Sequence, residues 1–93
     1  MKNIAILGST GSIGTQALDV IKQHPDQFEA RVLTAGNNSD LLIKQAREFS
    51  PDIVVIANEA KYDQVKDALA DLPIKVYAGA DAISQVVTND EVD

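Results

Sequence analysis

The 93-residue sequence contains no cysteine, which excludes disulfide bonds and cysteine-ligated zinc sites and fits a reducing compartment. Basic residues are also few: eight Lys and Arg stand against 14 Asp and Glu, giving a net charge of −6. A general nucleic-acid or acidic-membrane partner favours a basic face, so we expect neither.

Long hydrophobic runs are missing as well. No apolar stretch approaches the length of a membrane span, and Met1, Lys2 and Asn3 lead straight into a predicted strand with no signal peptide before it. We therefore expect a soluble, cytoplasmic protein. With 45% hydrophobic residues, the chain can build the core of one small domain, 1–93.

The most informative stretch is the first fifteen residues. Lys2 to Leu7 form a short apolar run, which predicts a strand buried on both faces of a parallel sheet. Glycines follow at positions 8, 11 and 14, and a helical pattern begins directly after them. A strand, a glycine-rich turn and a helix in this order are typical of the opening of a dinucleotide-binding βαβ unit.

Each residue type has a physical reason in such a turn. Gly8 permits the tight reversal from strand to helix, Gly11 lets the backbone approach a pyrophosphate at the helix N-terminus, and Gly14 allows the helix to pack closely on the strand. The hydroxyls that can donate to phosphate oxygens or cap the helix belong to Ser9, Thr10 and Ser12. The spacing is GxxGxxG, so the alternative of a structural turn that binds nothing stays open.

The rest of the chain alternates between the two periodicities. We expect strands at 28–35, 53–56 and 74–78. Helices are expected at 12–23, from the capping loop 36–39 to about 50, from the N-cap Asn58 to Pro73, and from Gly79 onward. The apolar stripe predicted for the first helix comprises Ile13, Ala17, Val20 and Ile21. The only histidine, His24, lies at the end of that helix, where contact with the last carbonyls is the favoured interpretation.

This alternation predicts an α/β fold, a Rossmann-like parallel sheet with helices on both faces and about four β-α units. The sheet is expected to be incomplete, because the chain stops before any strand on the other side of the first strand. Ile4 to Leu7 would then be an apolar edge with unpaired backbone groups, which predicts a homodimer through the exposed sheet edge.

The end of the second strand discriminates between the nicotinamide cofactors. NAD-binding proteins usually place Asp or Glu there, whereas this chain has the polar run from Gly36 to Ser39, whose amide and hydroxyl donors suit a 2′-phosphate. NADP is therefore favoured. Asp40 lies just beyond, and we interpret it as a first-turn acid that stabilises the helix dipole. Lys44 and Arg47 are expected to be solvent-exposed.

Five short runs of the chain together resemble the N-terminus of 1-deoxy-D-xylulose 5-phosphate reductoisomerases. They are Ile6 to Gly14, Leu18 to Ile21, His24-Pro25-Asp26 with Phe28, Ala35 to Asn38, and Phe49 to Pro51. The resemblance implies an NADPH-dependent oxidoreductase that rearranges and reduces 1-deoxy-D-xylulose 5-phosphate to 2-C-methyl-D-erythritol 4-phosphate in non-mevalonate isoprenoid biosynthesis. It also implies Mg²⁺ or Mn²⁺ in the parent enzyme.

By position, the resemblance implies roles for two loops. Around the pyrophosphate it places Thr10, Gly11, Ser12 and Ile13, within the turn that Gly8 and Gly14 delimit. Around the adenosine ribose phosphate it places Gly36, Asn37 and Asn38.

The family's metal-binding carboxylates, substrate phosphate site and lid lie in later segments, so the resemblance implies no catalytic or metal-ligating residue in 1–93. These residues alone are expected to be inactive and to need the remaining domains of the parent enzyme as partners. Two alternatives stay open: a fragment of another NAD(P) oxidoreductase, such as a semialdehyde dehydrogenase, and a stand-alone dinucleotide-sensing or interaction module without catalysis.

Overall fold

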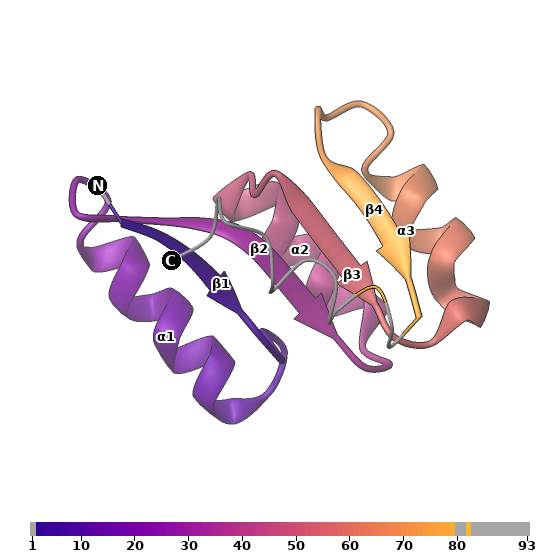
Figure 1. The fold of residues 1–93 in the computed structure, drawn as a ribbon, viewed down its shortest axis with the longest axis horizontal. Coiled ribbons are helices and arrows are strands. Elements are labelled where there is room, and N and C mark those ends of the chain that lie inside the picture. Colours follow the sequence, from indigo (N-terminus) through magenta and orange to yellow (C-terminus); the bar gives the residue numbers. More distant parts are fainter. Residues whose placement is uncertain (1, 80–81, 83–93) are drawn as a thin grey trace.

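The computed structural model describes residues 2–79 and 82 and shows four parallel strands in the order β1-β2-β3-β4 (Figure 1). Each of the first three strands is followed along the chain by helical structure that leads back to the start of the next strand. The elements are β1 (Lys2–Ile6), α1 (Ser12–Gln23), β2 (Phe28–Ala35), α2 (Ser39–Phe49), β3 (Ile53–Ile56), the 3-10 helix η1 (Glu59–Lys61), α3 (Tyr62–Ala68) and β4 (Lys75–Ala78). The predicted α/β fold with a Rossmann-like parallel sheet is confirmed.

The two faces of the sheet carry different amounts of apolar packing. Side chains alternate along β3, so that Val54 and Ile56 belong to the main core with residues of α1, α2 and α3. Val55 lies on the opposite face with Val32 of β2, and Ala82 packs against this smaller cluster. The helices α1, α2 and α3 therefore cover one face. Of the last helix expected after Gly79, the structure describes only Ala82, which is helical, and the remainder lies outside the described residues.

Strand β1 is less buried than the sequence suggested. Among the described residues it pairs with β2 alone, and within it only Ile6 is buried. The expectation of a strand buried on both faces is therefore wrong: its side chains are mostly half-buried, because the edge of the strand without a neighbour leaves them open to solvent. The expected edge position of this apolar strand agrees with its pairing.

Helix α1 has the predicted bounds, and of its predicted stripe Ile21 is buried and Ala17 packs against the core, whereas Ile13 and Val20 are not buried. Ile13 is 83% exposed and Val20 is 50% exposed, whereas the buried residues are Gly14, Leu18 and Ile21. These three follow the i, i+4, i+7 spacing counted from Gly14. The close approach of Gly14 to the preceding turn fixes the rotation of the helix and leaves Ile13 on the outside.

Helix α3 also differs from the prediction. Asn58 does act as an N-cap, but it caps η1, since its Oδ1 accepts from the Ala60 N–H at 3.0 Å. The helix ends at Ala68, before Pro73, because the chain continues in tight turns, in which the Leu72 N–H bonds to the Leu69 carbonyl at 3.0 Å. Within the described part of the chain, no helix has both the length and the apolarity that crossing a membrane requires.

Candidate functional site

The glycine turn between β1 and α1 is bound to the carboxyl end of β2. The Gly8 N–H donates to Thr34 Oγ1 at 2.8 Å, and the Ser9 N–H donates to the Thr34 carbonyl at 2.7 Å. Gly8 has φ +71°, a conformation that residues with a Cβ rarely adopt, so glycine is required here. The turn thus lies beside the next loop of the sheet, which follows Ala35.

Gly14 is required for packing. A Cβ built on it would lie 2.2 Å from the Gly8 carbonyl oxygen and 2.7 Å from Ser9 Cα, both of them backbone atoms. The predicted role of Gly14, close packing of the helix on the strand and its turn, is confirmed. Gly14 is also buried, so it packs beneath the turn and is not part of its exposed surface.

Gly11 differs from both of these glycines. A Cβ on it would lie 3.4 Å from the Gly8 carbonyl oxygen, close to an ordinary contact, and its φ of −81° suits any residue. Because Gly11 is the N-cap of α1, no side chain caps the first helical turn. The exposed residues Gly11, Ser12 and Ile13 therefore present an uncapped helix N-terminus, whose N–H groups and dipole favour an anion.

The hydroxyls of this turn do not all face outward. Ser9 is fully buried, and its hydroxyl donates to Gln45 Oε1 at 2.7 Å while Gln45 Nε2 donates back to the Ser9 carbonyl at 2.8 Å. The expectation that Ser9 donates to a phosphate is therefore wrong, because α2 uses its hydroxyl. Thr10 is half-buried and Ser12 is exposed.

Thr34 and Gln45 are functional supports that the sequence analysis missed. A signal for Gln45 was present, because this polar residue interrupts the apolar stripe of α2 between Leu42 and Ala46. A polar side chain on the buried face of a helix needs a buried partner. The sequence alone did not identify that partner as the glycine turn.

The second loop follows β2 at the same edge of the sheet, and its residues Gly36, Asn37 and Asn38 are exposed. Asn38 Oδ1 accepts from the Leu41 N–H at 3.2 Å, so the predicted capping of α2 is confirmed. Gly36 has open space where a Cβ would stand, and its φ is not positive. Neither the backbone conformation nor the packing of the protein requires glycine at this position.

Side chains from later elements hold this second loop. Buried Ser39 donates to Gln64 Oε1 at 3.0 Å, and Gln64 Nε2 donates to Asp40 Oδ1 at 2.8 Å. Ser39 is therefore not available to a phosphate, contrary to expectation. Asp40 lies in the first turn of α2, as predicted, and is bound to Gln64 of α3.

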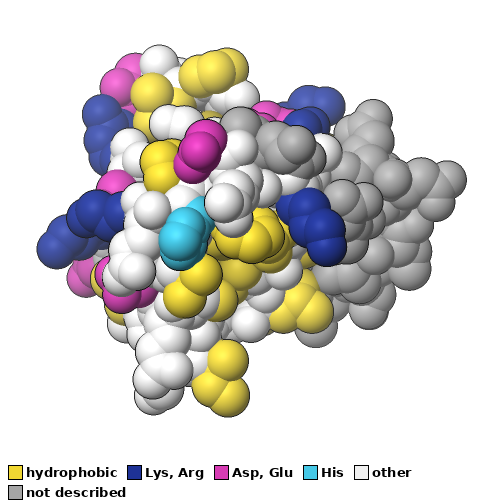
Figure 2. All heavy atoms as spheres, turned by 90° about the vertical axis from the view of Figure 1, so that its left-hand side faces the viewer, with side chains coloured by type: hydrophobic (Ala, Val, Ile, Leu, Met, Phe, Trp, Pro, Cys, Tyr) yellow, Lys and Arg dark blue, Asp and Glu magenta, His cyan; other side chains and the backbone are white. Residues whose placement is uncertain are grey.

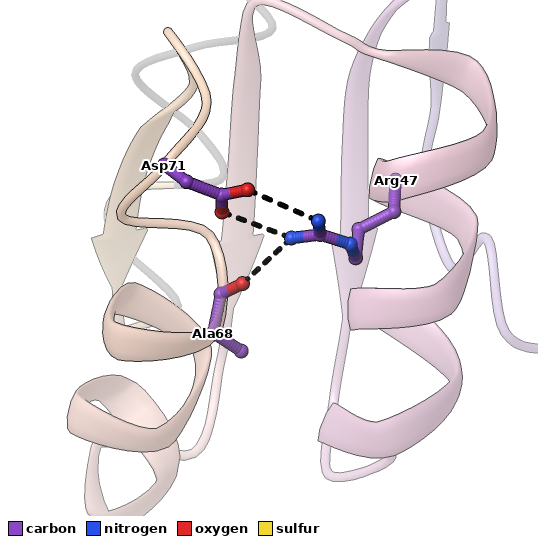
Figure 3. A network of polar contacts seen from close by, with 3 residues as sticks. All are labelled: Arg47, Ala68 and Asp71. Carbon is purple, nitrogen blue, oxygen red and sulfur yellow. Dashed lines mark hydrogen bonds and ion pairs between the residues drawn. The ribbon is translucent and has the colours of Figure 1, made fainter.

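Arg47 lies at the far end of α2, away from both loops. Its Nη1 donates to the Ala68 carbonyl at 3.0 Å, and its guanidinium forms a bidentate pair with Asp71 at 3.0 and 3.1 Å (Figure 3). The Arg47 hydrogen bond holds the pKa of Asp71 below its usual value and raises the pKa of Arg47. Arg47 and Lys44 are both exposed, as predicted, and Arg47 in addition joins α2 to the end of α3.

The opposite end of the sheet holds an apolar recess and the only histidine. His24 packs edge-on against Phe28, and its backbone N–H donates to the carbonyls of Val20 and Ile21, which confirms its predicted place at the helix end. Beside them lies a cavity of about 460 Å³ whose lining includes Phe28, Phe49 and the Lys22–Glu48 ion pair. Figure 2 shows the histidine next to hydrophobic side chains on this face. Across residues 2–79 and 82, no three His, Asp or Glu side chains come together as a metal site.

Comparison with known proteins identifies close relatives. The family model described as 1-deoxy-D-xylulose 5-phosphate reductoisomerase matches residues 4–93. The enzyme of that name from Phocaeicola vulgatus is 66% identical over 92 residues, which are 99% of this chain and 24% of that protein. The chain therefore spans about a quarter of the length of the curated relatives it matches.

Two solved structures have the same fold over this region. The 1-deoxy-D-xylulose 5-phosphate reductoisomerase from Zymomonas mobilis in complex with NADPH is 36% identical, with a TM-score of 0.86 over 90% of this chain and 22% of that one. A DOX-P reductoisomerase in complex with NADPH, fosmidomycin and magnesium is 30% identical, with a TM-score of 0.94 over 100% of this chain and 23% of that one.

Proposed function

The chain belongs to the 1-deoxy-D-xylulose 5-phosphate reductoisomerase family, and we propose that it is the part of such an enzyme that binds NADPH. The observation that carries this proposal is that two open loops lie next to each other at the carboxyl ends of neighbouring parallel strands. The first presents an uncapped helix N-terminus, and the second presents exposed amide side chains with no Asp or Glu among its three exposed residues. Relatives solved with NADPH support it.

We assign the pyrophosphate to the first loop. Thr10, Gly11, Ser12 and Ile13 surround the start of α1, where backbone N–H groups favour a negative charge. Gly11 supports this assignment because the fold leaves room for a Cβ there. The advantage of glycine is therefore clearance for a ligand.

We assign the adenosine ribose phosphate to the second loop, with Gly36, Asn37 and Asn38. Here too, a glycine stands where neither packing nor backbone conformation demands one. Bound NADPH would supply the hydride for reduction. The role of this chain is to bind and orient the adenosine half of the cofactor.

The reaction of the whole enzyme is part of the proposal, supported by the relatives: rearrangement and reduction of 1-deoxy-D-xylulose 5-phosphate in isoprenoid biosynthesis. One solved relative also holds magnesium. The described residues supply no ligand set for that metal, so we assign no metal ligand and no catalytic residue to this chain. Residues 1–93 by themselves should not turn over substrate, and turnover with substrate, Mg²⁺ and NADPH would contradict this.

The test of cofactor binding is a pair of calorimetric titrations of the protein, one with NADPH and one with NADH. We expect NADPH to bind with clear preference, because amide donors suit a 2′-phosphate. Equal binding of the two would place the 2′-phosphate elsewhere. Failure of both to bind would contradict the proposed function.

A second proposal concerns partners. Leu7 is 56% exposed at the end of β1, and Ile13 and Val20 are exposed on the adjacent helix. We propose that the edge of β1 and exposed apolar side chains such as Leu7 and Val20 are covered by further domains of the enzyme or by a second copy of the chain. Sedimentation tests the second copy: we expect association at high concentration, and a clean monomer would contradict a homodimer.

A further inference from the structure

Asn58 follows β3 and contacts the second loop at two points. Its backbone N–H donates to the Gly36 carbonyl at 2.9 Å, and its side-chain Nδ2 donates to Asn37 Oδ1 at 3.0 Å. Its Oδ1 in turn accepts from the Ala60 N–H at 3.0 Å. Asn58 is thus joined to the loop and to the start of η1 at the same time, and it is half-buried.

These bonds fix the orientation of both side-chain amides, that is, on which side each has its oxygen and on which side its nitrogen. The Ala60 N–H can only donate, so the side-chain atom of Asn58 that faces it is the oxygen. The nitrogen of Asn58 therefore faces Asn37, and the atom of Asn37 that accepts from it is again an oxygen. The group that exposed Asn37 can then offer to a ligand is its Nδ2, which carries two donors and accepts nothing.

We propose that Asn58 is a positioning residue that sets the preference for NADPH over NADH, by holding Asn37 with its amide donors available to the 2′-phosphate. This inference rests on the proposed function, in which the second loop holds that phosphate. A phosphate oxygen accepts hydrogen bonds and is repelled by a carbonyl oxygen. If the Asn37 amide were turned over, the same residue would oppose the phosphate that it now favours.

A change in affinity is expected for NADPH only. NADH has a ribose hydroxyl at this position, which both donates and accepts and so tolerates either orientation of Asn37. Loss of the Asn58–Asn37 hydrogen bond should therefore weaken the binding of NADPH and leave the binding of NADH nearly unchanged. A merely structural role for Asn58 would change the two affinities together.

The experiment measures the affinities of NADPH and NADH for wild type, N58S, N37A and the double variant. Serine keeps an oxygen that can cap η1 but is too short to hold Asn37. We expect N58S to weaken NADPH about tenfold or more, the scale of one hydrogen bond to a charged group, with NADH unchanged. In the N37A background, N58S should have no further effect on NADPH, since its target is gone.

The outcomes separate the inference from the proposed function. A wild type that binds neither cofactor contradicts the proposed function, and one that binds both without preferring NADPH contradicts the assignment of the 2′-phosphate to the second loop. A wild type that prefers NADPH, together with an N58S variant that keeps the same preference, overturns the inference alone. If N58S fails to fold, N58D makes the same comparison, because it retains the capping oxygen and the shape of Asn58 but has no amide donor. The loss of preference caused by N58D must then be larger in the wild-type background than in the N37A background, where only the added charge acts, and equal losses in the two backgrounds would overturn the inference.

Discussion

The two loops at the carboxyl edge of the sheet are held in different ways. The first, residues 8–14, is fixed by backbone contacts and buried hydrogen bonds to Thr34 and Gln45. The second, residues 36–39, is mostly exposed and is held by the amide side chains of Asn58 and Gln64. The first loop therefore resists change as part of the core, whereas Gly36 and Asn37 of the second can be altered without disturbing the fold.

The glycines show the same contrast. Gly8 and Gly14 are needed by the protein itself, one for its positive φ and the other because backbone atoms fill the place of a Cβ. Gly11 and Gly36 meet neither condition. Substitutions at the first pair should change the stability of the protein, and substitutions at the second pair should change its affinity for the cofactor.

The largest effect is expected for Gly14→Ala. Alanine is intrinsically favoured over glycine in a helix by about 1 kcal/mol, but its Cβ would here collide with the backbone of Gly8 and Ser9. We expect a net loss of about 3 kcal/mol in the free energy of unfolding, measured by urea denaturation. Gly36→Ala, with open space around the new Cβ, is the matched control. Equal stability of the two variants would refute the steric role of Gly14.

The next effect separates two serines of the same turn. Ser9→Ala leaves the buried Gln45 oxygen without its donor, so we expect a loss of about 1–3 kcal/mol in unfolding free energy. Ser12→Ala removes an exposed hydroxyl and should leave stability within about 0.5 kcal/mol of wild type. In calorimetry, Ser12→Ala should weaken NADPH. A Ser9→Ala protein as stable as wild type would show that Gln45 finds another partner.

Gly36→Ala should affect binding alone. The backbone there accommodates alanine, so urea denaturation should give an unfolding free energy within about 0.5 kcal/mol of wild type. The added methyl group should obstruct the approach of the cofactor and reduce NADPH affinity about tenfold, or about 1.4 kcal/mol. Unchanged affinity would remove Gly36 from the proposed site.

The smallest effect concerns the exposed Arg47–Asp71 pair, which lies away from both loops. The Arg47 hydrogen bond lowers the pKa of Asp71 in the folded protein. Its stabilising contribution is therefore present above the unfolded pKa of about 3.9 and is lost as the pH falls through the lower folded value. Denaturation series from pH 7 to pH 2 should show wild type slightly more stable than Asp71→Asn, with the difference closing at the acid end.

Asp67→Asn serves as the control for that pair, because it removes one negative charge from α3 and leaves the contact with Arg47 in place. A gap between wild type and Asp71→Asn that stays constant over the whole pH range would contradict the role of this carboxylate. Cofactor affinity should be the same in all three proteins, since the pair lies at the other end of α2.

The sequence determined the class of the fold and most of its elements. Residues 28–35 and 53–56 were predicted as strands with the bounds that the structure has, and the helix at 12–23 likewise. These predictions succeeded because alternating, helical and continuous apolar patterns are local properties of the chain. The same locality explains why the glycine turn could be recognised. The assignment of cofactor atoms to its residues is a prediction that binding measurements test.

The tertiary structure decided which side chains are available. The close approach of Gly14 to the turn set the buried face of α1 and left Ile13 outside, against the predicted stripe. Gln45 occupies the hydroxyl of Ser9 from 36 residues away, and Asn58 orients Asn37 from 21 residues away. A polar side chain can donate or accept in several directions, and only its neighbours in space select one, so no local pattern could have revealed the partner of either residue.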